Sequence, residues 1–327
     1  MAQFIIRRML IMIPTMFVIS ILAFIIIQLP PGDFLTTMVA AMASQGEQVN
    51  QSAVQALEDQ YGLGQPIYIQ YWKWISNILF HGNFGRSFLY NLPVADLIGS
   101  RLLWTIGISV GSLLVTWLIA FPVGIYSAVR KYSIGDYIMT LISFIGLAVP
   151  EFMIALVLMW VSYRYLGQSV GGLYSPEYVD APWSIAKAFD LAAHLWIPII
   201  IVGAASTAGL IRIMRANLLD ELNKPYVVTA RAKGMEERKL LIKYPVRLAA
   251  NPFVSTVGWV LPGIISGEVI IGVVLSLPTI GPLLLQALLS QDMFLAGGLI
   301  LILSVLTLIG TLLSDILLAW LDPRIRY

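Results

Sequence analysis

Long apolar stretches recur along this chain and set its fold class. Crossing the hydrocarbon core of a membrane takes about 20 largely apolar residues, because an α-helix rises about 1.5 Å per residue and the core is about 30 Å thick. Six stretches reach this length, so the pattern predicts an all-α integral membrane protein with six transmembrane helices. Their approximate bounds are Met9–Leu29, Leu103–Val129, Tyr137–Tyr163, Leu195–Ile211, Phe253–Leu275 and Leu295–Leu321.

Composition supports a membrane protein and excludes several other classes. Of the 327 residues, 58% are hydrophobic and 12% are charged, whereas about a quarter are charged in a typical soluble domain. Such an excess of apolar side chains has to meet lipid. The absence of cysteine excludes disulfides, thiolate metal sites and thiol nucleophiles. A net charge of +2 without a basic, aromatic-rich patch argues against nucleic acid as a partner.

The distribution of Lys and Arg predicts the orientation in the membrane. If the N-terminus is cytoplasmic, the six helices place 15 of the 20 basic residues on the cytoplasmic side. The other five fall outside: Lys73, Arg86, Arg101, Arg164 and Lys187. The positive-inside rule therefore predicts a multi-pass protein of a plasma (inner) membrane with both termini cytoplasmic.

Two external segments follow from this topology, Pro30–Leu102 and about Arg164–His194. We divide the chain into residues 1–30 with the first helix, an external segment at 31–102, and a five-helix core at 103–327. Within the external segment, Ile67–Phe80 is amphipathic and rich in Trp and Tyr, which favour the headgroup region. This pattern is compatible with an interfacial helix or with a small cap packed on the bundle.

Three carboxylates fall within or at the edges of the predicted spans: Glu151, Glu268 and Asp315. A mid-helix acid costs about 2.5–3.5 kcal/mol to insert, so such residues usually face a polar cavity or a partner. Glu151 and Asp315 lie close enough to the span ends to reach water. The sequence around Glu268 includes Ser266 and Gly267, which leave room for water or solute. Ser266, Gly267 and Glu268 are therefore our candidates for the lining of a translocation path.

Small residues four positions apart predict close contacts between helices. They occur at Gly107/Gly111, Ala120/Gly124, Ala205/Gly209 and Gly263/Gly267. Prolines at positions 14, 122, 150, 198 and 262 allow kinks, because each removes one backbone hydrogen bond.

Groups for catalysis or for metal binding do not converge in this sequence, and we expect no enzymatic activity. The histidines, His81 and His194, lie in or beside the external segments without the spacing of zinc ligands. No phosphate-binding Gly-x-x-x-x-Gly-Lys-Ser/Thr sequence occurs, so any ATP has to bind another chain. An intramembrane hydrolase lacks a credible nucleophile and base.

A basic cytoplasmic loop, at about residues 212–250, connects the fourth and fifth spans. Its residues Tyr226–Lys233 favour a helix after Pro225, and Gly234 is placed to end that helix. Topology alone explains the basic residues, so composition leaves a solvated loop as one interpretation. The amino-acid sequence of the loop favours another interpretation.

Residues Tyr226–Gly234 resemble the EAA motif of ABC-importer permeases, in the form found in dipeptide, oligopeptide and nickel permeases. The most specific part is Thr229-Ala230-Arg231-Ala232-Lys233-Gly234. The resemblance extends over nearly the whole chain, through Arg7-Arg8, Pro31-Gly32-Asp33, Gly82 with Gly85 and Ser87, Leu277-Pro278, and Asp322-Pro323-Arg324-Ile325-Arg326. The acid of the motif is absent, because its Glu-Ala-Ala aligns with Val228-Thr229-Ala230.

This resemblance implies a type I (MetI-like) permease fold and a role as the first of two permeases in a bacterial or archaeal importer. Its expected partners are a homologous permease, one or two cytoplasmic ATPases that carry the ATP and Mg, an extracytoplasmic binding protein and the lipid bilayer. No cofactor is expected in this chain. The expected ATPase contact comprises Val228, Thr229, Ala230, Arg231, Ala232, Lys233 and Gly234. The alternative from another class is an ion-coupled carrier acting alone through Glu268 and Asp315.

Overall fold

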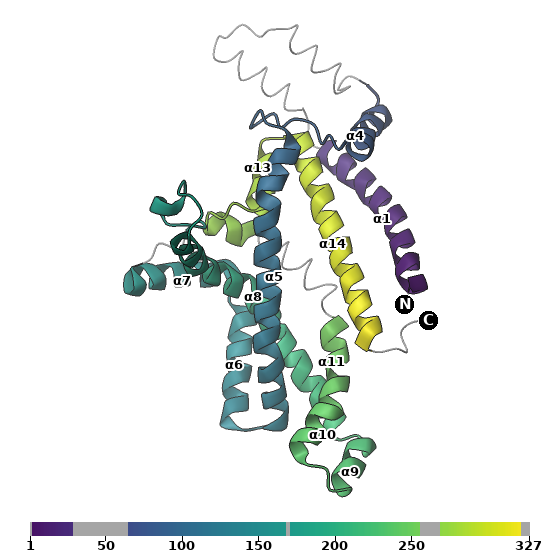
Figure 1. Ribbon diagram of the computed structural model, residues 1–327, viewed down its shortest axis with the longest axis vertical. Helices are drawn as coiled ribbons and strands as arrows, with labels where there is room; N and C mark the ends of the chain where they lie inside the picture. The colour runs from purple at the N-terminus through teal and green to yellow at the C-terminus, as the bar shows by residue number, and fades with distance from the viewer. Residues whose placement is uncertain (1, 29–64, 168–170, 256–268, 322–327) are drawn as a thin grey trace. The chain divides into compact units, whose positions relative to one another are not determined.

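The computed structural model describes residues 2–28, 65–167, 171–255 and 269–321 (Figure 1). In this part of the chain the regular structure is helical, with one isolated antiparallel bridge between Arg86 and Pro93. The helices are α1 (Ala2–Gln28), α4 (Ile67–His81), α5 (Val94–Val129), α6 (Ile134–Ala148), α7 (Glu151–Val161), the π-helical turn η1 (Ser162–Leu166), the 3₁₀ turn η2 (Pro176–Tyr178), α8 (Ile185–Leu222), α9 (Pro225–Ala232), α10 (Glu237–Lys243), α11 (Pro245–Ser255), α13 (Ile280–Leu289) and α14 (Met293–Leu321).

Among the described residues, four helices are long and apolar enough to span a membrane: α1, α5, α8 and α14. The pair α6 and α7 makes a fifth span if it is counted as one. These confirm an all-α membrane protein. Most of the predicted span Phe253–Leu275 lies outside the described residues, so the count of six stays a prediction.

The third predicted span, Tyr137–Tyr163, is not one straight helix. Helices α6 and α7 meet at an angle of 106°. The break lies at Val149-Pro150, where proline has no N–H for the helix and its ring disfavours helical geometry at the preceding residue. Val149 accordingly is extended, with ψ of 125°. Pro14, Pro122 and Pro198 instead lie inside continuous helices.

Helices α5 and α8 are longer than the spans predicted for them. The predicted Leu195–Ile211 is the middle of α8, which starts at Ile185 after a Ser184 cap that accepts from Lys187 N at 3.1 Å. Its 38 residues are about 57 Å long, well beyond the thickness of the hydrocarbon core. Hydropathy marks only the lipid-crossing part of such a helix.

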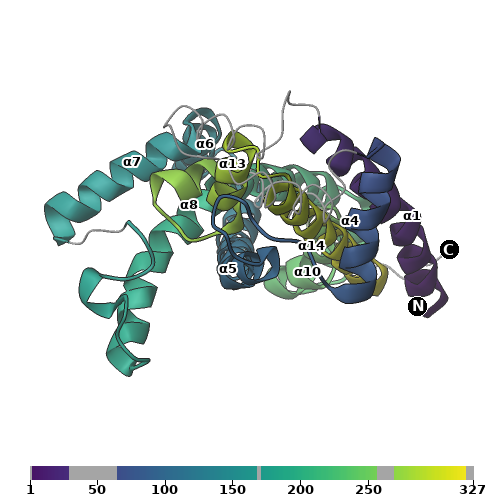
Figure 2. The same cartoon turned by 90° about the horizontal axis from the view of Figure 1, so that it is seen from above.

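The chain forms two compact units. One comprises residues 1–8, 105–278 and 307–327, and the other comprises residues 9–104 and 279–306. In the second unit, α4 lies against α1 (Figure 2), with Phe24 packing on Tyr71 and Trp74 at ring-centroid distances of 5.6 and 5.5 Å. The amphipathic stretch therefore packs through one face. Its interfacial location in a membrane stays a prediction.

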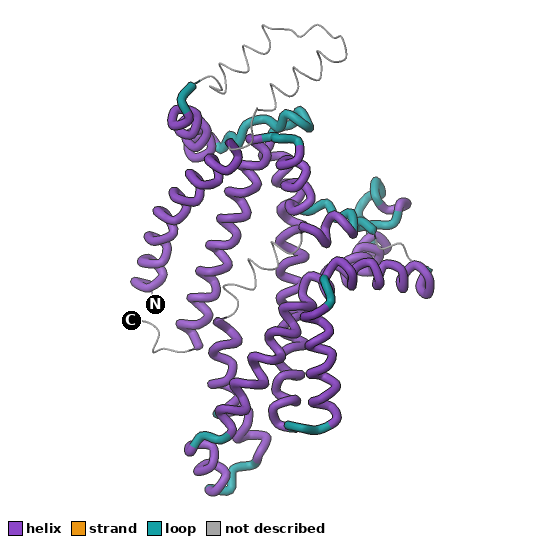
Figure 3. Tube along the Cα trace, turned by 180° about the vertical axis from the view of Figure 1, so that it is seen from behind, coloured by secondary structure: helices purple, strands orange, loops and turns teal. Residues whose placement is uncertain are grey.

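In the first unit, the part of α5 from Thr105 onward forms a hairpin with α6 through a short turn (Figure 3), and α8 packs against both. Small residues bring α5 and α8 together. A Cβ atom on Gly203 would lie 2.6 Å from Thr116 Oγ1, and one on Gly124 would lie 2.6 Å from Met214 Cβ. Gly111 is similarly close to Ile199, at 3.0 Å. Of the predicted contact positions, Gly111 and Gly124 are confirmed, whereas Gly107 and Gly209 have open space beside them.

An ion pair joins α6 to α8. Arg215 Nε and Nη2 each donate to a carboxylate oxygen of Asp136 at 2.8 Å. Asp136 is 2% exposed and also accepts from Tyr132 N at 2.9 Å. A planar guanidinium opposite a carboxylate fixes both distance and direction. Helix α6 is thereby held at its first turn.

Because α8 approaches α5 closely at Gly203, adding one methyl group at this position should affect stability more than adding one at Gly209. We expect Gly203→Ala to destabilise the protein by about 1–3 kcal/mol, because the new Cβ overlaps Thr116 and approaches the Ser112 carbonyl. Gly209→Ala is the matched control: nothing lies within 4 Å of its Cβ, and alanine favours the helix. Thermal unfolding in detergent measures the difference, and equal melting temperatures would contradict this packing.

Candidate coupling surface and translocation path

Helix α9 follows α8 after two residues and contains most of the predicted coupling motif. Lys224 is extended, with ψ of 146°, as expected before a proline. Pro225 then starts α9, where its missing N–H costs nothing. The predicted helix, Tyr226–Lys233, agrees with the observed Pro225–Ala232 to within one residue.

Gly234 ends α9 in a Schellman motif. Its φ is +76°, and Gly234 N donates to Arg231 O at 3.0 Å while Met235 N donates to Ala230 O at 3.3 Å. A Cβ at this position would meet nothing within 4 Å. The backbone conformation, and not lack of space, therefore requires glycine here.

Three contacts hold α9 in place. The Val227 side chain is fully buried. The Tyr226 hydroxyl donates to Glu221 in the last turn of α8, and the Tyr226 ring meets Tyr244 edge to face at 6.4 Å. Burial raises the pKa of Tyr226, and the hydrogen bond to Glu221 raises it further, so the hydroxyl stays protonated and donates.

The opposite face of α9 is exposed. It includes Val228, Thr229, Ala232 and Lys233, with Val228 54% exposed, while the exposed Arg231 lies to its side. The Thr229 hydroxyl donates to Pro225 O at 2.9 Å, so its side chain lies along the helix. This face combines a large apolar side chain with a basic group. It is a short, rigid ridge suited to a protein partner.

Arg231 also ties α9 to α10. Its Nε and Nη2 donate to the two carboxylate oxygens of Glu237 at 3.0 and 2.6 Å. These hydrogen bonds hold the pKa of Glu237 below its usual value. Both side chains are about half exposed, so the pair fixes geometry more than it adds stability.

Helices α10 and α11 pack back onto the bundle. Leu240 of α10 is fully buried, and Val246 and Ala249 of α11 join a cluster with Met214 and Leu218 of α8. The segment from α9 to α11 is therefore attached to α8 through both its start and its end. The predicted coupling residues therefore lie on a folded segment that is packed on α8 at both ends.

The candidate path residues Ser266, Gly267 and Glu268 lie outside the described residues. Of the other two carboxylates, Asp315 on α14 pairs with Arg8 on α1, with Oδ2 and Nη1 3.2 Å apart. Glu151 lies in the first turn of α7, where the helix dipole favours an anion. This ion pair links α14 to α1, so Asp315 has a structural role.

His194 lies inside α8 and is 3% exposed, and its predicted location in or beside an external segment stays a prediction. Its Nδ1 is 2.7 Å from Asp190 O. The Asp190 carboxylate accepts from Ser175 N at 2.8 Å and from Ser175 Oγ at 2.6 Å, which fixes the preceding loop on α8. Its place in a helix follows from the start of α8, which lies ten residues before the predicted span. Among the described residues, no cluster of His, Asp and Glu has the makeup of a metal site.

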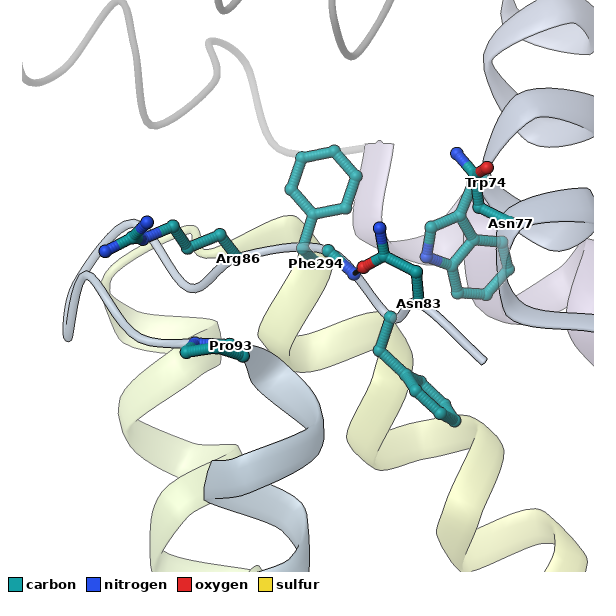
Figure 4. A pocket seen from close by; sticks show the side chains of 8 residues that line it. Trp74, Asn77, Asn83, Arg86, Pro93 and Phe294 are labelled. Atoms are coloured by element: carbon teal, nitrogen blue, oxygen red, sulfur yellow. Dashed lines mark hydrogen bonds between the residues drawn. The ribbon is translucent and has the colours of Figure 1, made fainter. Parts of the chain in front are cut away.

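Buried polar groups that sequence analysis missed connect the segment between α4 and α5 to the start of α14. Asp292, fully buried at the start of α14, accepts from Ser87 Oγ at 2.6 Å and from Leu89 N at 3.1 Å. Gly85 has a φ of +88° and lies against the Phe294 ring. Beside them a cavity of about 230 Å³ (Figure 4) is lined by Trp74, Asn77, Asn83, Phe84, Gly85, Arg86, Pro93 and Phe294.

Comparison with known proteins identifies the family. Residues 120–327 match the family described as binding-protein-dependent transport system inner membrane component, and residues 1–109 match the N-terminal part of such components. The chain belongs to this family. It is a permease subunit of an ATP-binding-cassette importer.

Full-length relatives have consistent descriptions. The permease is 37% identical to the oligopeptide transport system permease protein AppB of Bacillus subtilis, over the whole of both chains. It is 32% identical to a putative peptide permease of Brucella ovis, over all of this chain and 99% of the relative. It is 30% identical to the glutathione transport system permease protein GsiC of Escherichia coli K12, again over both whole chains.

The contact between Tyr226 and Glu221 predicts how firmly α9 is held. We expect Tyr226→Phe to lower the hydrogen-exchange protection of α9 about tenfold, because a hydrogen bond to a charged acceptor contributes about 1.5 kcal/mol. Tyr244→Phe keeps the ring pair and is the matched control, with protection unchanged. Exchange measured by mass spectrometry on the purified permease compares the two. A similar loss in both variants would contradict the assigned hydrogen bond.

Proposed function

We propose that this permease and a second, homologous permease form the translocation path of an importer for peptides or a similar small solute. An extracytoplasmic binding protein delivers the solute, and one or two cytoplasmic ATPases, which carry the ATP and Mg, drive transport through the 226–239 segment. The observation that carries this proposal is α9: a motif-bearing helix with one face buried on its own bundle and the other face exposed.

The exposed face fits a docking role. Val228 provides apolar area, and Lys233 provides positive charge at the end of the helix. Because α9 is held to α8 by Tyr226 and to α10 by Arg231, a force on this face is passed to the bundle. A flexible loop would absorb the same force through its own backbone rotations.

The proposed orientation places α9 and both termini in the cytoplasm. The bias in Lys and Arg supports it, since most basic residues of the chain then lie on the side of α9. The segment at 31–102, including α4, is then external and available to the binding protein. Ser266, Gly267 and Glu268 remain the proposed path residues.

The peptide-like solute is proposed from the relatives. Relatives of this permease are described as oligopeptide, peptide and glutathione permeases. These solutes share a peptide backbone and a free carboxylate. The described residues of the permease do not distinguish among these solutes. We expect the binding protein to set the specificity.

The alternative of a carrier working alone is not favoured. It requires membrane carboxylates that are free to take up and release an ion. Asp315, one of its two proposed groups, is instead paired with Arg8. The family assignment also supports the importer and not the carrier.

The test of this proposal uses Gly234 in the complete reconstituted importer. Gly234→Val forces a β-branched residue to positive φ, which costs about 1–2 kcal/mol and distorts the end of α9. We expect uptake to fall at least tenfold while membrane insertion is unchanged and ATP hydrolysis is no longer stimulated by the loaded binding protein. Uptake and ATP hydrolysis are measured in the same proteoliposomes.

The control is Gly234→Asn, because asparagine adopts positive φ with little strain. It should retain most of the uptake. Normal uptake in Gly234→Val would contradict the coupling role. Uptake by the permease alone, driven by an ion gradient without ATP, would support the carrier instead.

A further inference from the structure

The polar cavity of about 230 Å³ lies entirely within the second compact unit, where α4 ends and α14 starts (Figure 4). Trp74, Asn77 and Asn83 are grouped on one side of it, Arg86 lies on the other side, and Phe294 lies between them. None of these residues belongs to the coupling surface or to the proposed path. The chemistry of the cavity therefore calls for an explanation of its own.

Several hydrogen-bond donors around the cavity are not used within the protein. In the part of the chain that the structure describes, neither the Trp74 indole N–H nor the Asn77 side-chain amide makes a hydrogen bond. Asn83 Oδ1 accepts from Gly85 N at 2.9 Å, which orients this side chain and leaves its amide N–H groups as donors. An occupant with hydrogen-bond acceptors would satisfy these groups.

Arg86 gives the cavity a positive charge. Its Nε and Nη2 donate to Asn91 O at 3.1 and 2.8 Å, so the guanidinium is oriented while Nη1 keeps its donors. Among the described residues no Asp or Glu lines the cavity, and the buried Asp292 already accepts three hydrogen bonds elsewhere. The group that complements this charge and these donors is a carboxylate.

The wall of the cavity is built in advance of any occupant. Gly85 has a φ of +88°, and a Cβ added there would lie 3.0 Å from the Phe294 ring. On either side, Val94 N donates to Gly85 O at 3.0 Å and Ser87 Oγ donates to the buried Asp292 at 2.6 Å. An occupant does not have to order this backbone, which lowers the cost of binding.

A carboxylate could reach this cavity on a free solute or on a side chain of a partner protein. Asn77, Asn83 and Arg86 are exposed, and a few exposed hydrogen bonds do not offset the entropy that a free small molecule loses when it is fixed. A side chain of a protein that docks over a larger surface does not lose this entropy a second time. Trp and Arg beside a small cavity are also typical of protein–protein contacts.

We propose that this cavity receives an acidic side chain of the binding protein. The inference rests on the proposed function, whose orientation places the end of α14 in the cytoplasm and Phe294, in its first turn, outside. Permanent subunit interfaces are more apolar than transient ones, so a polar, charged cavity fits the partner that arrives and leaves in each cycle. An exposed charge pair favours rapid association with that partner.

The first test measures how tightly the solute-loaded binding protein binds the assembled importer in lipid nanodiscs, by biolayer interferometry. Asn77→Asp adds a negative charge with almost no change of shape, and Arg86→Gln removes a positive charge. We expect each variant to weaken binding at least tenfold. Arg164→Gln is the matched control, because it removes the same charge from an exposed position of the first unit, and it should change binding less than twofold.

Unchanged binding in Asn77→Asp and Arg86→Gln, or equal weakening in all three variants, would overturn the proposal. Failure of the unaltered importer to bind its binding protein would instead contradict the proposed function.

The second test identifies the occupant. Arg86→Lys keeps the charge and supplies an amine, which a carbodiimide joins directly to a carboxylate in contact with it. We expect mass spectrometry of the docked complex to find position 86 linked to an Asp or Glu of the binding protein, and no such link in Arg164→Lys at position 164. A link from position 86 only to the second permease or to this chain itself, or no link at all, would overturn the proposal.

Discussion

The attachment of α9 to the end of α8 is the constraint on which the proposed function depends. A short helix of eight residues has little stability of its own, because the few hydrogen bonds it forms do not offset the entropy of ordering it. Here burial of Val227 and the hydrogen bond from Tyr226 to Glu221 supply what local propensity lacks. The exposed face of α9 is therefore fixed relative to α8.

The same constraint extends into the bundle through α8. About ten residues before α9, Arg215 holds the first turn of α6 through Asp136. Further along, Gly203 brings the backbone of α8 against Thr116 of α5. These contacts differ in kind, one ionic and directional and the other steric, yet both oppose sliding of α8 past its neighbours. We expect a displacement at α9 to reach α6 and α5, because α8 is one continuous helix from Gly203 through Arg215 to its end.

Local signals in the sequence predicted the elements that depend on local physics. Proline at the start and glycine after the end identified α9 to within one residue, and Trp and Tyr at helical spacing identified α4 to within one residue. Apolar length identified the spanning regions α1, α5, α8 and α14, although their ends were misjudged where a polar helix continues past the membrane.

Features that depend on distant partners could not be predicted. The buried Asp292 bonds to Ser87, 205 positions away, and no pattern near either residue announces the pair. The partnership of Arg215 with Asp136 is equally remote in sequence. The sequence permitted the bend at Pro150, yet Pro14, Pro122 and Pro198 stay within helices, so the presence of a proline alone does not predict where a span breaks. The proposed path at Ser266–Glu268 rests on the sequence alone.

The central claim is that α8 and the coupling segment move as one body during transport. Asp220 of α8 and Arg238 of α10 are exposed and the chain has no native cysteine, so both positions accept nitroxide labels in a double-cysteine variant. Double electron–electron resonance then measures the distance between the labels in the assembled importer, without nucleotide and with ATP and vanadate. The account predicts the same distance distribution in both states. A shift or a marked broadening with ATP would show that the segment hinges on α8, and would contradict it.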